Sequence, residues 1–235
     1  MSASSVDKPL SPGLKSKGPG IGGHVLKKGK GRIMIRNIIF DMGQVLIRFD
    51  RDTFIRRLNI SGEDTKLLIN EVFLSLEWAR LDWGSMTEEE AVQAVCRRLP
   101  ARLHEAARQL ITAWDKPLLP IEGMAELLQD LKGRGYRLYL LSNASFRQHE
   151  YWPGVPGCEL FDGTLISCDI GHIKPEPEIY QALCGKFSLK PEECFFVDDS
   201  PVNVEGAIRC GMEGTVFYGD AEQLRAVLRR VGFLE

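Results

Sequence analysis

Four short stretches of this sequence carry carboxylate, hydroxyl, amide and amine side chains that could share one chemical task. In chain order they are Asp41, Ser142-Asn143, Lys174 and Asp198-Asp199. Clustered carboxylates repel one another unless a cation joins them, and a few hard oxygen ligands together with water suit Mg²⁺. A lysine, a hydroxyl and a backbone amide suit a phosphoryl group, and a carboxylate beside them can attack phosphorus to form an aspartyl phosphate. The metal and the lysine would neutralise charge on the transferring group.

Each of these residues also has an ordinary interpretation when it is taken alone. Asp41 is then the first residue of a loop, and Ser142 caps a helix. Asp198-Asp199 forms a turn, and Lys174 is a solvated loop lysine. We favour the joint interpretation because of the order and spacing of the four stretches along one chain.

Parallel strands are the elements that would position these residues. Residues 38–40 form a continuous apolar run, which is typical of a central strand covered on both faces. Strands are predicted over residues 33–40, 136–141, 163–167, 194–197 and 215–218. Helices are predicted over residues 123–134, 177–187 and 221–231. This alternation predicts an α/β fold with a doubly wound parallel, Rossmann-like sheet. The carboxyl ends of its strands would share the edge where such sheets bind ligands.

Residues 51–115 interrupt this alternation with helical signals alone. Ser61 is a candidate cap of one helix, and residues 101–113 predict another. The stretch that begins at Thr87 has the pattern of a capping box. We therefore expect a helical cap domain here, inserted into a Rossmann-like catalytic core made of residues 33–50 and 116–235.

Residues 1–32 differ in composition from the rest of the chain. They are rich in Ser, Pro, Gly and Lys, and they predict a disordered basic tail. Residues 18–23 match the spacing of a dinucleotide-binding loop, but no strand precedes them and Pro19 lies inside them, so we exclude that function. Because the tail holds seven basic residues and one acidic residue, the remainder of the chain is acidic. An acidic body argues against nucleic acid as the main partner.

The composition narrows the class of protein further. The 235 residues are 44% hydrophobic and 26% charged, which is ordinary for a globular protein. No apolar run approaches the roughly 20 residues needed to cross a bilayer, and the amino terminus lacks the apolar segment of a secretory signal. The six cysteines include no CxxC pair. We therefore expect a reduced, cytoplasmic protein with no membrane partner.

In combination, the four stretches resemble the motifs of the haloacid dehalogenase-like (HAD) superfamily, whose members are mostly Mg²⁺-dependent phosphatases. The resemblance runs from Ile35 to the carboxyl end, and the matching segments are residues 40–46, 141–143, 174–175 and 197–203. The helical segment is similar to the cap that this superfamily inserts after its first motif.

The resemblance implies a role for each residue of the motifs. Asp41 would be the catalytic nucleophile, assisted by Lys174. The groups that hold the phosphoryl oxygens would be Ser142, Asn143 and Lys174. The ligands of Mg²⁺ would be Asp41, the backbone carbonyl of Gly43, and Asp199. The supporting residues would be Asp198 and Asn203, the latter standing where many members have a second aspartate.

One position departs from the pattern of the family. Most of its phosphatases have an aspartate two residues after the nucleophile, as general acid and base, and this chain has Gly43 there. General acid–base assistance is typically worth about 10²–10⁴ in rate. Without it, acidic leaving groups would be favoured, so sugar 1-phosphates should react faster than sugar 6-phosphates. A bacterial branch of sugar-phosphate phosphatases also carries glycine there, and residues 151–153 and 167–180 resemble that branch.

We therefore predict a Mg²⁺-dependent phosphatase of a small phosphorylated metabolite, in the sugar 1-phosphate class. A haloacid dehalogenase, a phosphosugar mutase and a non-catalytic binding protein are the alternatives, because Gly43 replaces the usual acid. Four residues are candidates both for facing the substrate and for packing inside the cap: Trp78, Arg80, Asp82 and Trp83. The sequence gives no indication of the oligomeric state.

Overall fold

The computed structural model describes residues 34–60 and 62–235, and these residues contain a five-stranded sheet with the strand order β3-β2-β1-β4-β5. All neighbouring strands are parallel. The strands are β1 (Asn37–Phe40), β2 (Arg137–Ser142), β3 (Gly163–Ile166), β4 (Cys194–Asp198) and β5 (Glu213–Val216). The predicted parallel α/β fold is therefore confirmed, and the apolar run before Asp41 is the central strand.

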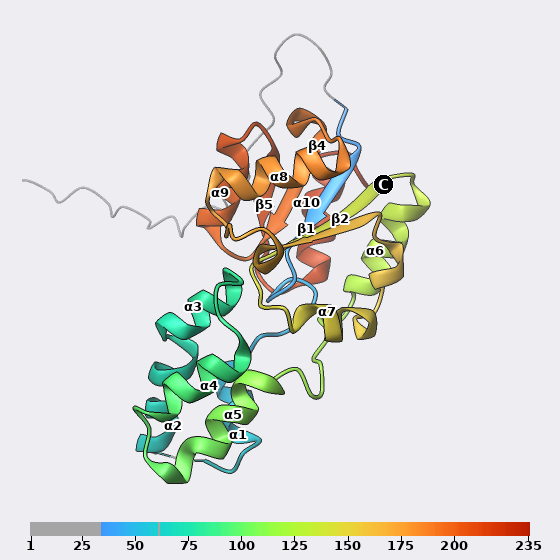
Figure 1. Cartoon of the computed structure of the whole chain (residues 1–235). Helices are drawn as coiled ribbons and strands as arrows, with labels where there is room; N and C mark the ends of the chain where they lie inside the picture. The colour runs from blue at the N-terminus through green and yellow to red at the C-terminus, as the bar shows by residue number, and fades with distance from the viewer. Residues whose placement is uncertain (1–33, 61) are drawn as a thin grey trace, which may run out of the picture.

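The two faces of the sheet are covered by different helices (Figure 1). Successive residues of a strand point to opposite faces. Ile38 and Phe40 pack in one hydrophobic cluster with residues of α6 (Met124–Gly133) and α10 (Ala221–Arg230). Ile39 packs in another cluster with residues of α8 (Pro177–Phe187) and α9 (Pro201–Arg209). Because both faces are buried, β1 has no polar residue between Ile38 and its end.

Two strands, β1 and β5, start two or more residues from their predicted starts, whereas β2, β3 and β4 match their predictions to within one residue at each end. β1 begins at Asn37 rather than at residue 33, because both neighbouring strands start opposite Asn37. β5 begins at Glu213, two residues before the predicted start, because Glu213 already pairs with Phe195 of β4. Helix α9 and the short α7 (Gln148–Tyr151) have no separate prediction. The predicted tail, residues 1–32, lies outside the described residues.

Five helices follow β1 and form a separate group at one end of the sheet (Figure 1). They are α1 (Arg51–Arg56), α2 (Glu63–Leu68), α3 (Leu76–Asp82), α4 (Glu88–Cys96) and α5 (His104–Thr112), with a π-helix over Ile69–Phe73. They share their own hydrophobic cluster, distinct from the two at the sheet. Thr87 and Glu90 form the predicted capping box. Ser61 lies outside the described residues, and α2 starts after Gly62 without a side-chain cap. We call α1–α5 the helical segment.

The chain enters and leaves the helical segment through two stretches that lie side by side. Ile47 forms an antiparallel bridge with Pro120. The Arg48 N–H donates to the Leu119 carbonyl at 2.7 Å, and the Ile121 N–H donates to the Leu46 carbonyl at 3.0 Å. The entry and the exit are thus hydrogen-bonded to each other.

Short 3₁₀ turns complete the structure, at Ala101–Leu103, Trp152–Gly154, Cys158–Leu160, Ser167–Asp169 and Pro191–Glu193. Of the helices in the described part of the chain, none combines the length and the apolar character that crossing a bilayer requires.

Candidate active site

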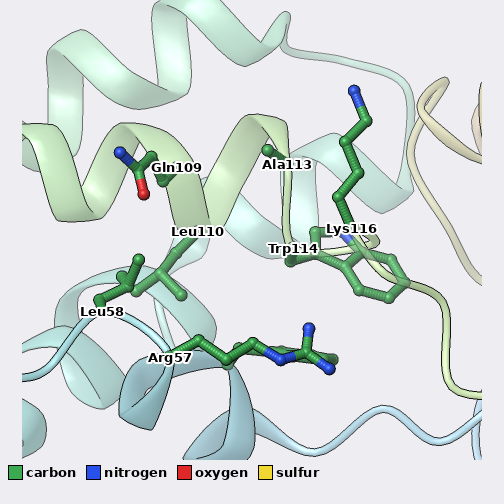
Figure 2. A pocket seen from close by; sticks show the side chains of 8 residues that line it. Arg57, Leu58, Gln109, Leu110, Ala113, Trp114 and Lys116 are labelled. Atoms are coloured by element: carbon green, nitrogen blue, oxygen red, sulfur yellow. The ribbon is translucent and has the colours of Figure 1, made fainter.

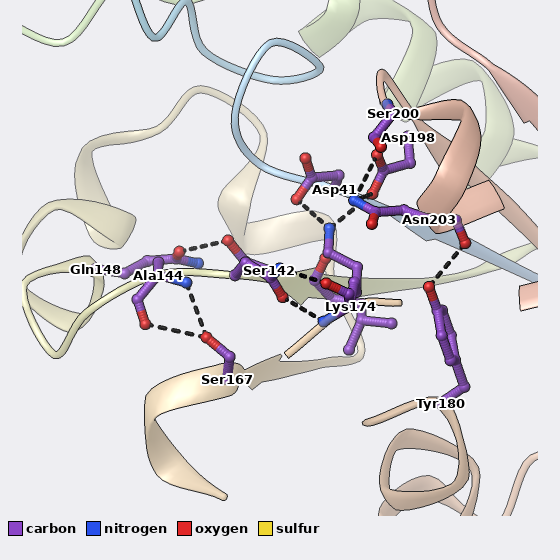
Figure 3. A network of polar contacts seen from close by, with 12 residues as sticks. Asp41, Ser142, Ala144, Gln148, Ser167, Lys174, Tyr180, Asp198, Ser200 and Asn203 are labelled. Atoms are coloured by element: carbon purple, nitrogen blue, oxygen red, sulfur yellow. Dashed lines mark hydrogen bonds and ion pairs between the residues drawn. The ribbon is translucent and has the colours of Figure 1, made fainter. Parts of the chain in front are cut away.

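The ends of β1 and β4 bring Asp41 and Asp198 together around a buried lysine (Figure 3). The Lys174 ammonium donates to Asp41 Oδ1 at 2.6 Å and to Asp198 Oδ2 at 2.7 Å. Its third hydrogen bond goes to the Leu141 carbonyl at 3.0 Å. Lys174 is 3% exposed, so all three of its protons have protein acceptors in a place that bulk water does not reach. This arrangement excludes the solvated-lysine interpretation.

The electrostatics of this group follow from its burial. Burial raises the pKa of Asp41 to about 7; the Lys174 ammonium opposes that rise, and the Asp198 carboxylate adds to it. Burial alone would lower the pKa of Lys174, but Asp41 and Asp198 together raise it. Lys174 therefore stays charged, whereas burial disfavours the ionised form of Asp41.

Asp199 adds a third carboxylate at the exposed side of this group. One carboxylate oxygen from each of Asp41, Asp198 and Asp199 lies within 4.8 Å of the others. Burial and the Asp198 carboxylate raise the pKa of Asp199. Three carboxylates against one ammonium leave an excess of negative charge, which a hard divalent cation such as Mg²⁺ would neutralise. Among the described residues, no backbone hydrogen bond uses the Gly43 carbonyl, so it can join the oxygen donors.

Asp198 is held by more partners than Asp41. Its Oδ1 accepts from the Ser200 N–H at 2.8 Å, and Asn203 Nδ2 lies 3.1 and 3.2 Å from its two oxygens. The Asn203 carbonyl accepts in turn from the Tyr180 hydroxyl at 2.7 Å. Asn203 therefore fixes the Asp198 carboxylate, and an amide suits this task because it can donate where a second aspartate would repel.

Ser142, the last residue of β2 (Figure 3), and the following Asn143 have protein partners of their own. The Ser142 hydroxyl donates to Gln148 Oε1 at 2.7 Å in a fully buried contact. The Asn143 side chain accepts from the Lys174 N–H at 2.8 Å and donates to the Lys174 carbonyl at 3.0 Å. Asn143 thus fixes the backbone of Lys174, a positioning contact that the sequence does not indicate.

The four candidate residues of the helical segment have different environments. Trp78 packs against Phe49 and Phe73 inside the segment, and Arg80 is exposed. Asp82 and Trp83 lie where α3 meets the sheet, because the Ser167 hydroxyl donates to the Asp82 carbonyl at 2.5 Å. Packing is therefore the role of Trp78, whereas Asp82 belongs to the junction.

A second junction contact has no signal in the sequence. The buried Arg147 donates to Glu88 through Nε at 2.6 Å and through Nη2 at 2.7 Å. Its Nη1 also donates to Asp115 Oδ1 at 3.3 Å. Arg147 follows β2, whereas Glu88 begins α4, so the pair joins the core to the helical segment. The two residues are 59 positions apart, and no local pattern links them.

A pocket of about 190 Å³ lies at the helical segment, between α1 and α5 (Figure 2). Its walls come from α1, α5 and the stretch after α5, and they include Leu58, Leu110 and Trp114. Two cations, Arg57 and Lys116, are the charged residues among those that line it. The pocket shares no residue with the site around Lys174.

Comparisons with known proteins identify the family of this chain. A model of the haloacid dehalogenase-like hydrolases matches residues 35–211. The chain is 30% identical to sesquiterpene phosphatase astK from Aspergillus oryzae, over 75% of this chain and 86% of the relative. It is 26% identical to D-ribitol-5-phosphate phosphatase from Bacteroides thetaiotaomicron, over 77% of this chain and 90% of the relative. The alignments cover 40% and 37% of the length of two other curated relatives.

Two solved structures extend the comparison. A predicted HAD-like family hydrolase from Porphyromonas gingivalis superposes with a TM-score of 0.64 at 28% identity, over 85% of this chain and 98% of that one. The magnesium complex of the HAD family enzyme bt-2542 from Bacteroides thetaiotaomicron gives a TM-score of 0.63 at 26% identity, over 81% and 98%. The chain therefore belongs to the haloacid dehalogenase-like hydrolase family.

Proposed function

We propose that this protein is a Mg²⁺-dependent phosphatase that hydrolyses a small phosphorylated metabolite through an aspartyl phosphate on Asp41. The observation that carries the proposal is the Lys174 ammonium bridging Asp41 and Asp198, with the exposed carboxylate of Asp199 beside them. Two relatives named as phosphatases support it, and so does the relative solved as a magnesium complex. In this proposal the helical segment is the cap over the site.

In the proposed reaction, Asp41, Lys174 and the metal-binding groups have different roles. Among the described side-chain hydrogen bonds of Asp41, only Oδ1 is engaged, so Oδ2 is the atom for attack on phosphorus. Lys174 orients Asp41 and places positive charge beside the transferring group. Mg²⁺ would be held by Asp41, Asp199 and the Gly43 carbonyl, where it would neutralise the phosphoryl oxygens. A water then attacks the same phosphorus, and the bond to Asp41 breaks to restore its carboxylate.

The substrate class that we propose is a sugar 1-phosphate. Gly43 offers no acid beside the nucleophile, and an anomeric hydroxyl is a better leaving group than a primary hydroxyl because the ring oxygen withdraws charge. The resemblance of residues 151–153 and 167–180 to a bacterial branch of sugar-phosphate phosphatases supports the same class. The two named phosphatase relatives have other substrates in their names, so this class rests on chemistry rather than on their names.

A phosphate-release assay over sugar phosphates and nucleotides, with Mg²⁺ and with EDTA, tests the proposal. We expect release only with Mg²⁺, and a higher kcat/KM for glucose 1-phosphate than for glucose 6-phosphate. Metal-independent halide release from a 2-haloacid would identify a dehalogenase instead. Exchange of glucose 1-phosphate and glucose 6-phosphate without phosphate release would identify a mutase. Binding of sugar phosphates without any turnover would identify a non-catalytic protein.

A further inference from the structure

The end of α3 is fixed to the edge of the sheet by one buried hydroxyl. Ser167 donates to the Asp82 carbonyl and accepts from the Ala144 N–H at 2.9 Å. Ala144 lies two residues after Ser142, in the loop that leaves β2 at the site. Ser167 is fully buried. The backbone of Asp82 is therefore held next to the catalytic edge, rather than merely within reach of it.

The loop after Asp82 fits the core through a glycine. Gly84 has a φ of +68°, and a Cβ on it would lie 2.2 Å from the Cys168 carbonyl oxygen. Only a residue without a side chain can adopt this backbone conformation at this separation. The loop therefore touches the turn over Ser167–Asp169 directly, which gives the end of α3 a second fixed point.

The carboxyl of Asp82 is half-buried at this junction. Within residues 34–60 and 62–235 no hydrogen bond or ion pair involves it; the hydrogen bond of this residue is made by its carbonyl. Burial and then the Asp41 carboxylate raise the pKa of Asp82 to about 7, and the Lys174 ammonium opposes them. The same carboxyl helps to raise the pKa of Tyr151 and of Cys168. Asp82 thus lies among the charged groups of the site without an assigned partner.

We propose that Asp82 is the general acid and base of this enzyme, supplied by the helical segment in place of the carboxyl that Gly43 lacks. The inference rests on the proposed phosphatase function, and it reduces the expected preference for glucose 1-phosphate, because Asp82 protonates the less acidic leaving oxygen of glucose 6-phosphate. The Asp82 carboxyl is near the site and has no hydrogen-bond partner among the described residues, so it is available to the substrate. General acid–base catalysis is most efficient when the pKa of the group lies near the working pH.

In the first of two proposed steps, Asp41 Oδ2 forms a bond to phosphorus while the bond from phosphorus to the leaving oxygen breaks. The electron pair of the broken bond stays on that oxygen, which takes the proton of the Asp82 carboxyl and leaves as the alcohol. In the second step a water oxygen forms a bond to phosphorus while the Asp82 carboxylate takes a proton from that water. The P–O bond to Asp41 then breaks, inorganic phosphate leaves, and both carboxyl groups return to their initial states.

Leaving groups that differ in acidity test this role. Asp82→Asn keeps the shape and the hydrogen-bonding capacity but cannot donate a carboxyl proton. With Mg²⁺ present, kcat for glucose 6-phosphate should fall by about 100-fold or more, the lower end of general acid–base assistance. For p-nitrophenyl phosphate, whose leaving group needs no proton, kcat should fall by less than about tenfold. Asp52→Asn is the matched control: it is the same substitution at an exposed residue of α1, and it should leave both rates unchanged.

A second variant keeps the test sharp if Asp82→Asn alters the junction. A Cβ at Gly43 would meet no atom within 4 Å, and its φ is not in the left-handed region, so Gly43→Asp fits sterically. Added to Asp82→Asn, it should recover the glucose 6-phosphate rate at least tenfold, which a merely structural defect at Asp82 would not allow.

The outcomes separate this inference from the proposed function. Equal losses on the two substrates, or a rise in KM with kcat unchanged, would overturn the role of Asp82 while leaving a working phosphatase. An absence of Mg²⁺-dependent phosphate release from either substrate by the unmodified protein would overturn the proposed function itself. A selective loss that Gly43→Asp repairs supports both.

Discussion

Arg147 holds Glu88 with two hydrogen bonds across the junction between the core and the helical segment. The guanidinium uses Nε and Nη2 for Glu88, at 2.6 and 2.7 Å, and Nη1 for Asp115. The Arg147 side chain is 6% exposed. Charge-assisted, two-point contacts of this kind fix orientation as well as distance, and a lysine could not replace the planar fork. The buried Arg147 side chain therefore connects three parts of the chain: the start of α4, the stretch after α5 that contains Asp115, and the loop after β2.

Removing the charge of Glu88 should loosen this junction. We expect Glu88→Gln to cost about 1–3 kcal/mol, because Arg147 keeps Asp115 but loses its best partner. That cost corresponds to a fall in Tm of several degrees, at about 2–4 °C per kcal/mol for a chain of this size. KM for the phosphorylated substrate should rise with it. The matched control is Glu89→Gln, whose carboxylate pairs with Arg108 on the surface of the helical segment. Such exposed pairs contribute little, so equal losses in the two variants would contradict the role of the junction.

Asp41→Asn tests the nucleophile. The amide preserves the shape, but it removes both the attacking oxygen and one charge of the metal site. Turnover of glucose 1-phosphate should fall below about one hundredth of the wild-type rate, since covalent catalysis is lost. Because burial raises the pKa of Asp41, the neutral amide should fold at least as well in EDTA, where Tm is compared. A variant that kept more than that residual rate would exclude Asp41 as the nucleophile.

Lys174→Met should destabilise the metal-free protein. It leaves Asp41 and Asp198 buried without their shared cation, and breaking a buried pair by removing one partner costs about 3–5 kcal/mol. Lys174 lowers the pKa of Asp41, so that pKa should rise in the variant. The loss of stability relative to the wild type should therefore grow as the pH rises above about 7, where Asp41 ionises in the folded wild type but not in the variant. Urea unfolding in EDTA measures it. Lys190→Met, at an exposed lysine, is the control, and a pH-independent loss would refute the electrostatic explanation.

The raised pKa of Asp82 should make the free energy of unfolding depend on pH. The ordinary value is 3.8 and the value in the folded protein is about 7. Between these values the folded state holds a proton that the unfolded state has released, so this group makes stability fall as the pH rises from about 4 to 7. Asp82→Asn removes that contribution, so its stability relative to wild type should improve across the same window in EDTA.

Asp64→Asn provides a control of opposite sign. A hydrogen bond from Arg102 lowers the pKa of Asp64. The Asp64 carboxylate therefore stabilises the wild type above its ordinary pKa, and this contribution is lost as the pH falls below about 4. The stability of Asp64→Asn relative to the wild type should improve as the pH falls. If Asp82→Asn and Asp64→Asn changed in the same direction with pH, the opposite pKa shifts assigned to these two residues would be wrong.

Gly84→Ala should displace the end of α3. The new Cβ would meet the Cys168 carbonyl oxygen and would also strain the backbone at positive φ. Gly62→Ala introduces the same strain, at a φ of +63°, where a Cβ meets nothing within 4 Å. We expect a larger fall in both Tm and kcat for the first variant, measured at saturating substrate. If Gly84→Ala and Gly62→Ala lowered Tm and kcat equally, the close approach of Gly84 to Cys168 would not contribute to activity.

The sequence predicts the catalytic edge of the sheet because its signal is local. An apolar run followed by a carboxylate indicates both a buried strand and the side chain at its end, as at Asp41 and Asp198. The parallel topology then brings those ends together, and the proline after Lys174 predicts a loop there. The family resemblance joins these stretches in one site, and the structure places Asp41, Lys174 and Asp198 in direct contact.

The junction could not be predicted in the same way. Arg147 and Glu88 are an ordinary charged pair in the sequence, and their contact depends on how two separate hydrophobic clusters are oriented. Asp82 appears among the candidates only as one of several polar or aromatic residues of its helix. Its position depends on Ser167 and on the absence of a side chain at Gly84, which are tertiary facts. The starts of β1 and β5 deviate for a related reason, because the pairing partners decide where a strand begins.

The paired entry and exit of the helical segment have a consequence for how such enzymes diversify. Arg48 and Leu119 are joined by a backbone hydrogen bond, and so are Leu46 and Ile121. The two ends of the insertion are therefore held together by contacts that do not involve the residues between them. If residues 50–116 were replaced by the corresponding residues of a relative, the hydrogen bonds between the entry and the exit of the insertion would therefore remain. Such an exchange would replace the residues that face the substrate together with Asp82, while the nucleophile Asp41 and the carboxylates after β4 stay with the strands.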